Sequence, residues 1–478
     1  MNHTNNNLSP EDRLAQLQQE YDTAQKELRR LERNLQRQRD YNVYLRQNYD
    51  AVVQSAGHRL LERYYRIRQT LRISTLLGAV TRKTAPLMQK LTHLKHRITG
   101  NLTQEDMFQI VRKTKRFQIL PTASTETLAV RIHESFKRAN VPCTLLASDD
   151  APSAAVPYLL IDPAQSIAPA GIFMIYLTSQ ATLPDDGILN SAYAIWCSSQ
   201  TLITELTARG IPVSKLYYCP ADFDSFNEHN PSSITPITYY TYRFLLANDC
   251  ISFDTFYAHV GSYFSAISDK LCLTLPETPD RKASFDKDNA YGFNFFPGLK
   301  HHIGWIGCGM SYKMIFRLAA EHLTDSLLLC EDDVFFSDQF PRRWAQIDSY
   351  LKAHTDWDIF SGIMADMGNV SILEYVEADE DEYVYIDRMM SMVFNVYTPK
   401  LYPILADWNP DFRDKAANTI DRYLETKCSR VLTTCPFLVG HKEDLDSTIW
   451  NHKNAEYNPG IESSSKRLSL LIAAYLAK

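Results

Sequence analysis

The sequence predicts an α/β protein that is preceded by a long helical region. Three observations lead to this fold class. From about residue 117 onward, short apolar runs alternate with amphipathic helical patterns, as they do in parallel sheets with crossover helices. Before that point, apolar residues recur at heptad spacing among many charged ones. The chain has 478 residues, which is too long for a single hydrophobic core, so we expect several domains.

Changes in composition divide the chain into four predicted segments. We expect a coiled coil over residues 1–57 and a basic amphipathic helical segment over 58–115. A Rossmann-like middle domain is predicted for residues 116–250, and a second α/β domain for 251–478.

The first segment opens with a helix-start signal and continues as a heptad repeat. Ser9 can cap the helix, and Pro10 suits its first turn. Apolar side chains occupy most core positions, with Leu14, Tyr21, Leu28, Leu35 and Tyr49 at a, and Leu17, Ala24, Leu31 and Leu45 at d. This pattern predicts a coiled coil through which the protein forms homo-oligomers. The alternative is a single charged helix that packs on its own protein.

The second segment is strongly basic. Residues 58–97 contain ten Arg or Lys and one acid, whereas the whole chain has a formal net charge of −6. Apolar residues lie between these cations, and basic amphipathic helices of this kind bind anionic membrane surfaces. A solvated helical linker is the alternative. Nucleic acid is not an expected partner, because the rest of the chain is acidic and carries no recognisable nucleic-acid-binding module.

Cysteine usage and hydropathy predict a cytoplasmic protein. The nine cysteines stand singly, without a CxxC pair, as reduced thiols do in cytosolic proteins. The first residues lack the apolar stretch of a secretory signal, and no run of about 18 apolar residues is present. Together with the basic segment, these features predict a protein bound peripherally to the inner face of the cytoplasmic membrane.

The middle domain is predicted from a series of short apolar strands. These strands are "RFQILP", "CTLLA", "YLLID", "IFMIYL", "YAIWC" and "KLYYC", and amphipathic helices separate several of them. No GxGxxG or GxxxxGK[ST] motif is present, so a phosphate-binding loop is not expected. Through "WCSSQTLITELTARGIPVSKLYYCPADFD" this stretch resembles one Rossmann half of a GT-B glycosyltransferase. Because the donor-binding second half does not follow, the resemblance implies a non-catalytic or acceptor-side domain.

Three adjacent carboxylates follow a strand in the last domain. The sequence "SLLLCEDDVFF" places Glu331, Asp332 and Asp333 after an apolar strand, which itself follows a helix predicted over 310–325. Open α/β sheets bind ligands at the carboxyl ends of their strands. Unpaired carboxylates are costly near a core, so these acids either face water or meet a cation. Alternation along a strand would put Glu331 and Asp333 on one face, as in the D-x-D arrangement that joins Mn²⁺ or Mg²⁺ to a nucleotide diphosphate.

The acids belong to a series of five motifs that follow one another along the chain. The order is "LTLPETPDRK", "GWIGCGMSYKMIFRLAAEHLTDSLLLCEDDVFF", "DWDIFSG", "IDRYL" and "CPFLVGHKEDLDSTI", all within residues 268–452. In this order they resemble glycosyltransferase family 25, which includes bacterial lipopolysaccharide galactosyltransferases and collagen galactosyltransferases. The resemblance implies a GT-A-like nucleotide-sugar domain that inverts the anomeric centre and uses a UDP-sugar with Mn²⁺ or Mg²⁺.

The resemblance also assigns site residues. The expected donor-binding residues are Asp280, Arg281, Ser311, Glu331 and Asp332, and the expected metal ligands are Glu331, Asp333 and His441. Gly307, Cys308, Ser447 and Thr448 match further positions of the family motifs. His441 could equally be a plain loop histidine. The family usually has a histidine directly after the serine that matches Ser311, and this chain has Tyr312 there. The role of that histidine in relatives is therefore not carried over to this chain.

An inverting transfer also needs a carboxylate that deprotonates the acceptor hydroxyl. Asp421, in "NTIDRYLE", matches the family's late acid and is the first candidate for this catalytic base. Asp366, in "SGIMADMG", is the second candidate, although it could instead bind hydroxyls of the donor sugar.

These expectations combine into one function and one rival. The sequence predicts a metal-dependent inverting hexosyltransferase that moves galactose or glucose from a UDP-sugar to a hydroxyl of a bacterial surface glycan, such as lipopolysaccharide or capsule. Its expected partners are the UDP-sugar, a glycan or glycolipid acceptor, an anionic membrane surface and a second copy of the chain. The rival is a catalytically silent coiled-coil scaffold that organises glycan-assembly enzymes at the membrane.

Overall fold

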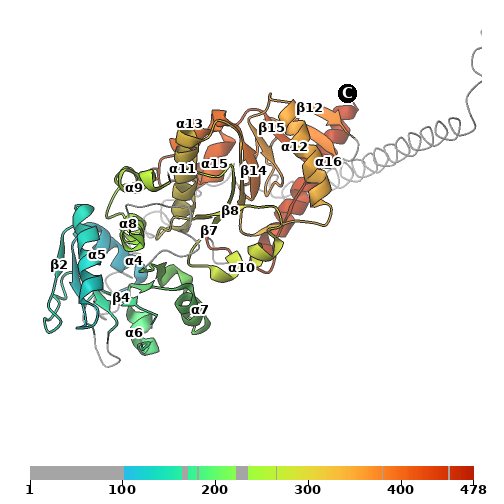
Figure 1. Cartoon of the computed structure of the whole chain (residues 1–478). Coiled ribbons are helices and arrows are strands. Elements are labelled where there is room, and N and C mark those ends of the chain that lie inside the picture. Colours follow the sequence, from blue (N-terminus) through green and yellow to red (C-terminus); the bar gives the residue numbers. More distant parts are fainter. Residues whose placement is uncertain are drawn as a thin grey trace, which may run out of the picture.

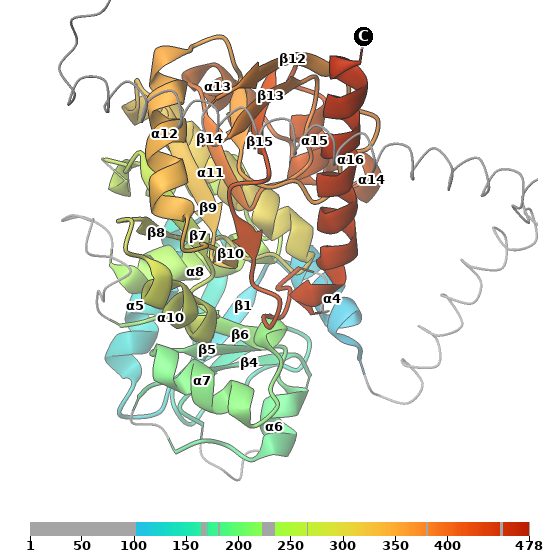
Figure 2. The ribbon, with the colours of Figure 1, turned by 90° about the vertical axis from the view of Figure 1, so that its right-hand side faces the viewer.

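The computed structural model describes residues 102–163, 169, 171–179, 182–221, 235–264, 266–378, 381–449 and 453–477. Within these ranges the protein is a mixed α/β structure built around two large sheets (Figure 1 and Figure 2). The expected α/β class with a parallel sheet is therefore confirmed. The predicted coiled coil over 1–57, and the predicted basic segment up to residue 101, lie outside the described residues.

The first described helix is α4 (Gln104–Thr114), and it packs against the core. A capping box fixes its start: Asp106 N donates to Thr103 Oγ1 at 3.1 Å, and Thr103 N donates to Asp106 Oδ2 at 3.1 Å. The buried face consists of Met107, Phe108 and Val111. This last part of the predicted basic segment therefore has a one-sided apolar face that the body of the protein covers.

The six-stranded sheet is entirely parallel, with the order β2-β1-β3-β4-β5-β6. Its strands are β1 (Phe117–Leu120), β2 (Cys143–Leu145), β3 (Tyr158–Ile161), β4 (Phe173–Leu177), β5 (Ala194–Cys197) and β6 (Leu216–Tyr218). The connecting helices are α5 (Glu126–Arg138), α6 (Asp186–Ser191), α7 (Gln200–Ala208) and the short η1 (Val213–Lys215). All six strands expected from the sequence are present. Strands β3, β4 and β5 are buried throughout, which explains their continuous apolar sequences.

Two helices connect the sheets. They are α8 (Pro236–Ala247) and α9 (Phe253–Val260), and the short η2 (Gly261–Tyr263) follows them. Every residue of α8 is buried, because α8 lies between the six-stranded sheet and the long helix α11 (Gly304–His322) (Figure 1). Ser252 caps α9, since its hydroxyl accepts a hydrogen bond from Thr255 N at 3.1 Å.

The eight-stranded sheet is mixed, with the order β12-β13-β15-β11-β14-β9-β7-β8. Its strands are β7 (Lys270–Thr274), β8 (Asn294–Pro297), β9 (Leu327–Glu331), β11 (Ile359–Ser361), β12 (Ile372–Glu377), β13 (Glu382–Ile386), β14 (Phe394–Tyr397) and β15 (Val431–Cys435). Strand β7 pairs in parallel with β8 and β9, whereas β14 runs antiparallel to β9. A separate antiparallel ladder joins β10 (Val334–Phe335) to β16 (Gly440–His441).

The other helices of this part cover the eight-stranded sheet or connect its strands. They are α10 (Pro279–Asp288), α12 (Phe340–Ala353), α13 (Tyr402–Ala406), α14 (Lys415–Asn418), α15 (Ile420–Glu425) and α16 (Asn458–Leu476), with the short η3 (Pro399–Leu401) and η4 (Asn454–Tyr457). Among the described residues, no helix has both the length and the apolar character needed to cross a membrane.

Helix α11 begins earlier than the sequence predicts. The prediction started this helix at residue 310, which is wrong, because the helix starts at Gly304. Glycines near its start serve close packing. A Cβ atom at Gly309 would lie 2.4 Å from the ring of Trp408, and one at Gly307 would lie 2.8 Å from His301 N.

A buried ion pair joins the two sheets. Arg243 and Glu277 are each 1% exposed, and Arg243 Nη2 donates to Glu277 Oε2 at 2.8 Å. Glu277 Oε1 also accepts a hydrogen bond from Tyr218 N at 2.8 Å. Tyr218 ends β6 of the first sheet and Glu277 follows β7 of the second. The carboxyl ends of these two strands therefore face each other across this network.

Lys300 lies in the same junction without a carboxylate bound to its ammonium group. Its Nζ donates to the carbonyl of Val213 at 2.7 Å and to that of Leu216. Burial lowers the pKa of Lys300 to about 8 from its ordinary 10.5, although the charge of Glu277 opposes this shift. Folding therefore removes a proton from this group over an alkaline range of pH.

We expect the free energy of unfolding to rise with pH between about 8 and about 10.5, by about 3 kcal/mol from Lys300 alone. In this window the unfolded chain holds a proton that the folded chain lacks, so raising the pH favours the folded state. Urea unfolding of the wild type and of Lys300→Met, at both ends of the window, isolates the contribution. The exposed Lys137→Met is the matched control. Equal pH dependence of the wild type and Lys300→Met would contradict this expectation.

Candidate functional site

The three predicted carboxylates lie at the carboxyl end of a central strand. Strand β9 ends at Glu331, Asp332 and Asp333 form a turn, and β10 begins at the next residue. Figure 2 faces this region, with β10 near the centre of the view. Asp332 and Asp333 are only 4% and 7% exposed. The acids are therefore held inside the protein, as charges that need partners.

Arg281 is the cation that meets these acids. From α10, its Nη2 donates to Asp332 Oδ1 at 2.5 Å and to Asp333 Oδ2 at 3.0 Å. Its Nη1 donates to the carbonyl of Asp446 at 2.7 Å. Burial alone would lower the pKa of Arg281, but the two carboxylates raise it well above its usual range, so the guanidinium stays charged.

Contrary to the prediction, the three acids do not alternate between the two faces of a strand. The strand ends at Glu331, so the two-residue period does not continue to Asp333. Asp332 and Asp333 instead share one guanidinium, while the Glu331 carboxylate has a separate partner on α11. This corrects the prediction that strand alternation would separate Asp332 from Asp333.

Asp332 has partners at both carboxylate oxygens. Oδ1 accepts from Arg281, and Oδ2 accepts from Thr274 Oγ1 at 2.6 Å. Thr274 is the last residue of β7, the strand next to β9. Through these two hydrogen bonds Asp332 connects β7 and α10 to the end of β9, and it orients the Arg281 guanidinium.

Asp333 lies beside His441, as required if both contribute to one site. Their strands pair, and His441 Nε2 is 3.3 Å from Asp333 Oδ2. The same oxygen accepts from Asn454 Nδ2 at 3.0 Å. Burial would raise the pKa of Asp333, but Arg281 and His441 hold it well below its usual range. Asp333 therefore remains ionised.

Each residue of this pair keeps one side-chain atom without a partner in the described part of the chain, and the His441 Nδ1 atom points away from Asp333 because Nε2 faces it. Asp333 Oδ1 and His441 Nδ1 are buried and have no hydrogen-bond partner within the described residues. No group of three or more His, Cys, Asp or Glu side chains in this part of the chain is arranged to hold a metal ion by itself. Mg²⁺ and similar ions are commonly held by one or two protein ligands together with phosphate oxygens of the substrate. The Asp333 carboxylate and the adjacent His441 Nε2 are close enough to serve as two neighbouring ligands, so these residues fit a metal that a nucleotide diphosphate helps to bind.

Glu331 differs from its two neighbours. Burial raises its pKa to about 8, and the negative charge of Asp333 adds to the rise. The hydroxyl of Tyr312 lies 3.1 Å from Glu331 Oε1 and 3.1 Å from the carbonyl of Met392. Tyr312 is fully buried on α11, so the residue that departs from the family pattern directly contacts the first acid of the triad.

The charge of Asp421 acts on two of the same side chains as the charges of Glu331 and Asp333. Burial raises the pKa of the Cys308 thiol, and three carboxylates increase this rise, those of Glu331, Asp421 and Asp333. Burial also raises the pKa of Tyr457, and the same three carboxylates add to this rise. Asp421 stands in the first turn of α15, where its Oδ1 accepts from Arg422 N at 2.8 Å. The structure thus brings this predicted base to the same region as the triad.

Asp366 lies farther toward solvent. Its side chain is 54% exposed, and Oδ2 is 3.9 Å from Arg422 Nη2. Its Oδ1 accepts from Gly368 N at 2.8 Å. The Asp366 carboxylate therefore lies near the Arg422 guanidinium, whereas Asp421 is among the carboxylates that raise the pKa of Cys308.

Two expected donor-binding residues do not reach the carboxylates. Asp280 is exposed in the first turn of α10. Ser311 is buried, and its hydroxyl accepts from Leu299 N at 2.7 Å and donates to the carbonyl of Gly307 at 2.8 Å. Ser311 thereby fixes the connection between β8 and α11.

Sequence reasoning missed three residues around the site: Thr274, Asn454 and Tyr457. Thr274 could have been found, because it ends the strand beside β9. Asn454 and Tyr457 carry no such signal, since a long segment with no repeated pattern brings them back to the site. The ring of Tyr457 meets that of His441 edge-on, with 5.6 Å between the ring centroids.

Comparison with protein-family models and with curated proteins finds no match for this chain. A proposal of function therefore rests on the residues of this site and on the resemblance of the surrounding motifs.

Proposed function

We propose that the protein is a metal-dependent inverting glycosyltransferase with a GT-A-like C-terminal domain. It would move a hexose, galactose or glucose, from a UDP-sugar to a hydroxyl of a bacterial surface glycan. The observation that supports this most is the pairing of Asp333 with His441 at the carboxyl end of β9. Each of the two residues keeps one buried atom without a partner in the described part of the chain.

The roles of the chain's own residues follow from their contacts. Asp333 and His441 would hold Mn²⁺ or Mg²⁺, and the bound ion would supply positive charge against the leaving diphosphate. Arg281 keeps Asp333 ionised and correctly placed, and Asp332 keeps Arg281 in position. Asn454 and the carbonyl of Asp446 bond to Asp333 and Arg281 respectively, which helps to hold these two groups in place.

The proton of the acceptor hydroxyl needs a base that carries no metal. Asp421 is half-buried, its charge acts on Cys308 together with those of Glu331 and Asp333, and among the described residues its Oδ1 is bonded only to Arg422 N. A carboxylate in this setting can accept a proton when an acceptor hydroxyl comes within hydrogen-bond reach. We assign this role to Asp421, with Asp366 as the second candidate.

The other proposals concern the rest of the chain. The six-stranded sheet would serve the acceptor side, because the carboxyl end of its strand β6 faces that of β7 through Glu277. The basic segment would bind the inner face of the cytoplasmic membrane, and the heptad segment would join copies of the chain. A catalytically silent scaffold is the second candidate. One observation favours it, because the Arg281 guanidinium already neutralises the carboxylates of Asp332 and Asp333, to which a metal ion would otherwise bind.

A donor screen tests the proposal. Purified full chain is incubated with a panel of UDP-hexoses, with Mn²⁺ or with a chelator, and released UDP is measured. We expect release from one hexose, at least tenfold faster with Mn²⁺. A scaffold would release no UDP from any donor under either condition, and this result would reject the glycosyltransferase.

A further inference from the structure

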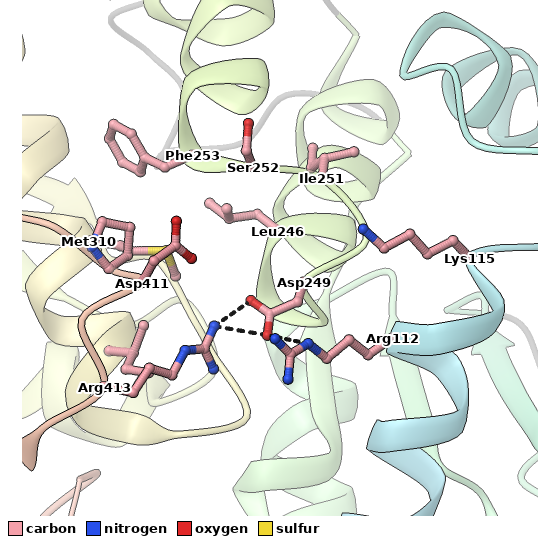
Figure 3. Close-up of a pocket in the computed structure, with 12 residues that line it drawn as sticks. Arg112, Lys115, Leu246, Asp249, Ile251, Ser252, Phe253, Met310, Asp411 and Arg413 are labelled. Atoms are coloured by element: carbon pink, nitrogen blue, oxygen red, sulfur yellow. Dashed lines mark hydrogen bonds and ion pairs between the residues drawn. The ribbon is translucent and has the colours of Figure 1, made fainter.

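A cavity separate from the carboxylate site lies where four parts of the chain meet (Figure 3). They are α4, the connection between α8 and α9, the first half of α11, and the 410–413 segment. The cavity has a volume of about 220 Å³. This is room for roughly seven waters at about 30 Å³ each, or for one small molecule. Its apolar wall consists of buried side chains, those of Leu246, Ile251, Phe253, Ile306 and Met310.

The charged wall of this cavity has an excess of cations. Three basic side chains line it, those of Arg112, Lys115 and Arg413, against two acids, Asp249 and Asp411. The formal charge of the lining is therefore positive. The N-terminal turn of α9 also borders the cavity through Ser252 and Phe253, and a helix N-terminus adds partial positive charge.

Asp249 fixes the two arginines in place. Arg413 Nη2 donates to both of its carboxylate oxygens at 2.9 Å, and Arg112 Nε lies 3.2 Å from Oδ2. Figure 3 shows the two guanidinium groups converging on Asp249 from opposite sides. Within the described residues, Arg413 Nη1 and both terminal nitrogens of Arg112 have no partner. Arg413 is thus oriented by two hydrogen bonds and Arg112 by one ion pair, while most of their donors stay available.

Lys115 provides the third positive charge of the cavity lining. It ends α4 with a left-handed backbone, at φ 45°, and its ammonium group has no carboxylate partner in the described part of the chain. Figure 3 shows this group directed into the cavity from the side opposite Asp411. A fixed guanidinium pair and an unpaired ammonium beside an apolar wall form a site for an oxyanion with a carbon skeleton.

We propose that this cavity binds a small molecule through a phosphate or carboxylate group. The oxyanion lies between Lys115 and the two arginines, and the rest of the molecule rests on the apolar wall formed by α8, α9 and α11. Such a ligand would join α4 to the 410–413 segment, two parts of the chain about three hundred residues apart. The site does not depend on the glycosyltransferase function proposed above.

Two variants with opposite expected effects test this proposal. Inorganic phosphate and succinate are titrated calorimetrically into the full chain, at constant ionic strength and without divalent metal. We expect saturable binding of at least one of them. Lys115→Met should weaken it about tenfold, because one attractive charge is lost at close range. Asp411→Asn should tighten it several-fold, because a repelling carboxylate is removed. Both side chains are exposed, so neither change threatens folding.

Lys113→Met is the matched control, since this exposed lysine lies on the last turn of the same helix but does not line the cavity. It should leave both dissociation constants unchanged. The proposal is wrong if neither anion binds saturably, or if Lys115→Met and Lys113→Met bind alike. It is also wrong if Asp333→Asn, rather than Lys115→Met, abolishes binding, because the anion then occupies the carboxylate site. The relative affinity for phosphate and succinate identifies which oxyanion the site prefers.

Discussion

Replacing Asp333 by asparagine should abolish metal-dependent UDP-sugar turnover, with a loss on the order of 10³-fold or more. Asp333 is the one acid of the triad that meets Arg281, Asn454 and His441 together and still keeps a buried oxygen without a partner in the described residues. An amide at this position carries no charge for a metal and puts an N–H donor where that carboxylate oxygen would bind the ion. The initial rate of UDP release at saturating Mn²⁺ measures the effect.

Two matched variants make this result specific. Asp332→Asn should lose less activity, because Asp332 is bonded to Thr274 and Arg281 and has no oxygen left for a metal. Asp348→Asn, in an exposed ion pair on α12, should be silent. Thermal unfolding of each variant shows whether the protein remains folded. Near-normal activity of Asp333→Asn in Mn²⁺ would refute the metal assignment.

Asp421→Asn should lower kcat by about 10²–10⁴ and leave UDP-sugar binding almost unchanged. Asp421 lies with Glu331 and Asp333 around Cys308 and Tyr457, yet it makes no contact with Arg281 or His441 in the described structure. A carboxylate in this position can meet an acceptor hydroxyl while the triad meets the donor. Turnover and equilibrium donor binding should be measured side by side for Asp421→Asn and Asp366→Asn.

Asp366→Asn is the internal comparison, because Asp366 is 54% exposed and its Oδ2 lies 3.9 Å from Arg422 Nη2. We expect it to change kcat much less than Asp421→Asn does. If Asp421→Asn weakens donor binding and spares kcat, Asp421 is a donor ligand. If Asp366→Asn shows the larger loss of kcat, the base has been assigned to the wrong acid.

The sequence predicted the position of the triad because the signal is local. An apolar strand after an amphipathic helix placed Glu331 at the carboxyl end of a strand, and the structure confirms this position. The start of α11 was missed because glycines usually interrupt helices. At Gly307 and Gly309, however, neighbouring backbone and a tryptophan ring leave no room for a side chain.

The partners of the triad could not be predicted in the same way. Asn454 and Asp333 are 121 residues apart, and no periodic pattern connects positions that distant. The mixed order of the eight-stranded sheet has the same cause, since β15 pairs with β11 and β13 only through long-range packing. The sharing of Arg281 by Asp332 and Asp333 depends on where β9 ends, and strand boundaries are poorly defined by sequence.

Calorimetric titration of UDP into the full chain, with Mn²⁺ and then with a chelator, tests the central claim most directly. The pairing of Asp333 with His441 predicts that UDP binds at least tenfold more tightly with Mn²⁺. It also predicts that Asp333→Asn loses this increment and keeps the weaker metal-free binding. Absence of UDP binding under both conditions, or equal affinity with and without Mn²⁺, would contradict a metal-assisted nucleotide-sugar site at the end of β9.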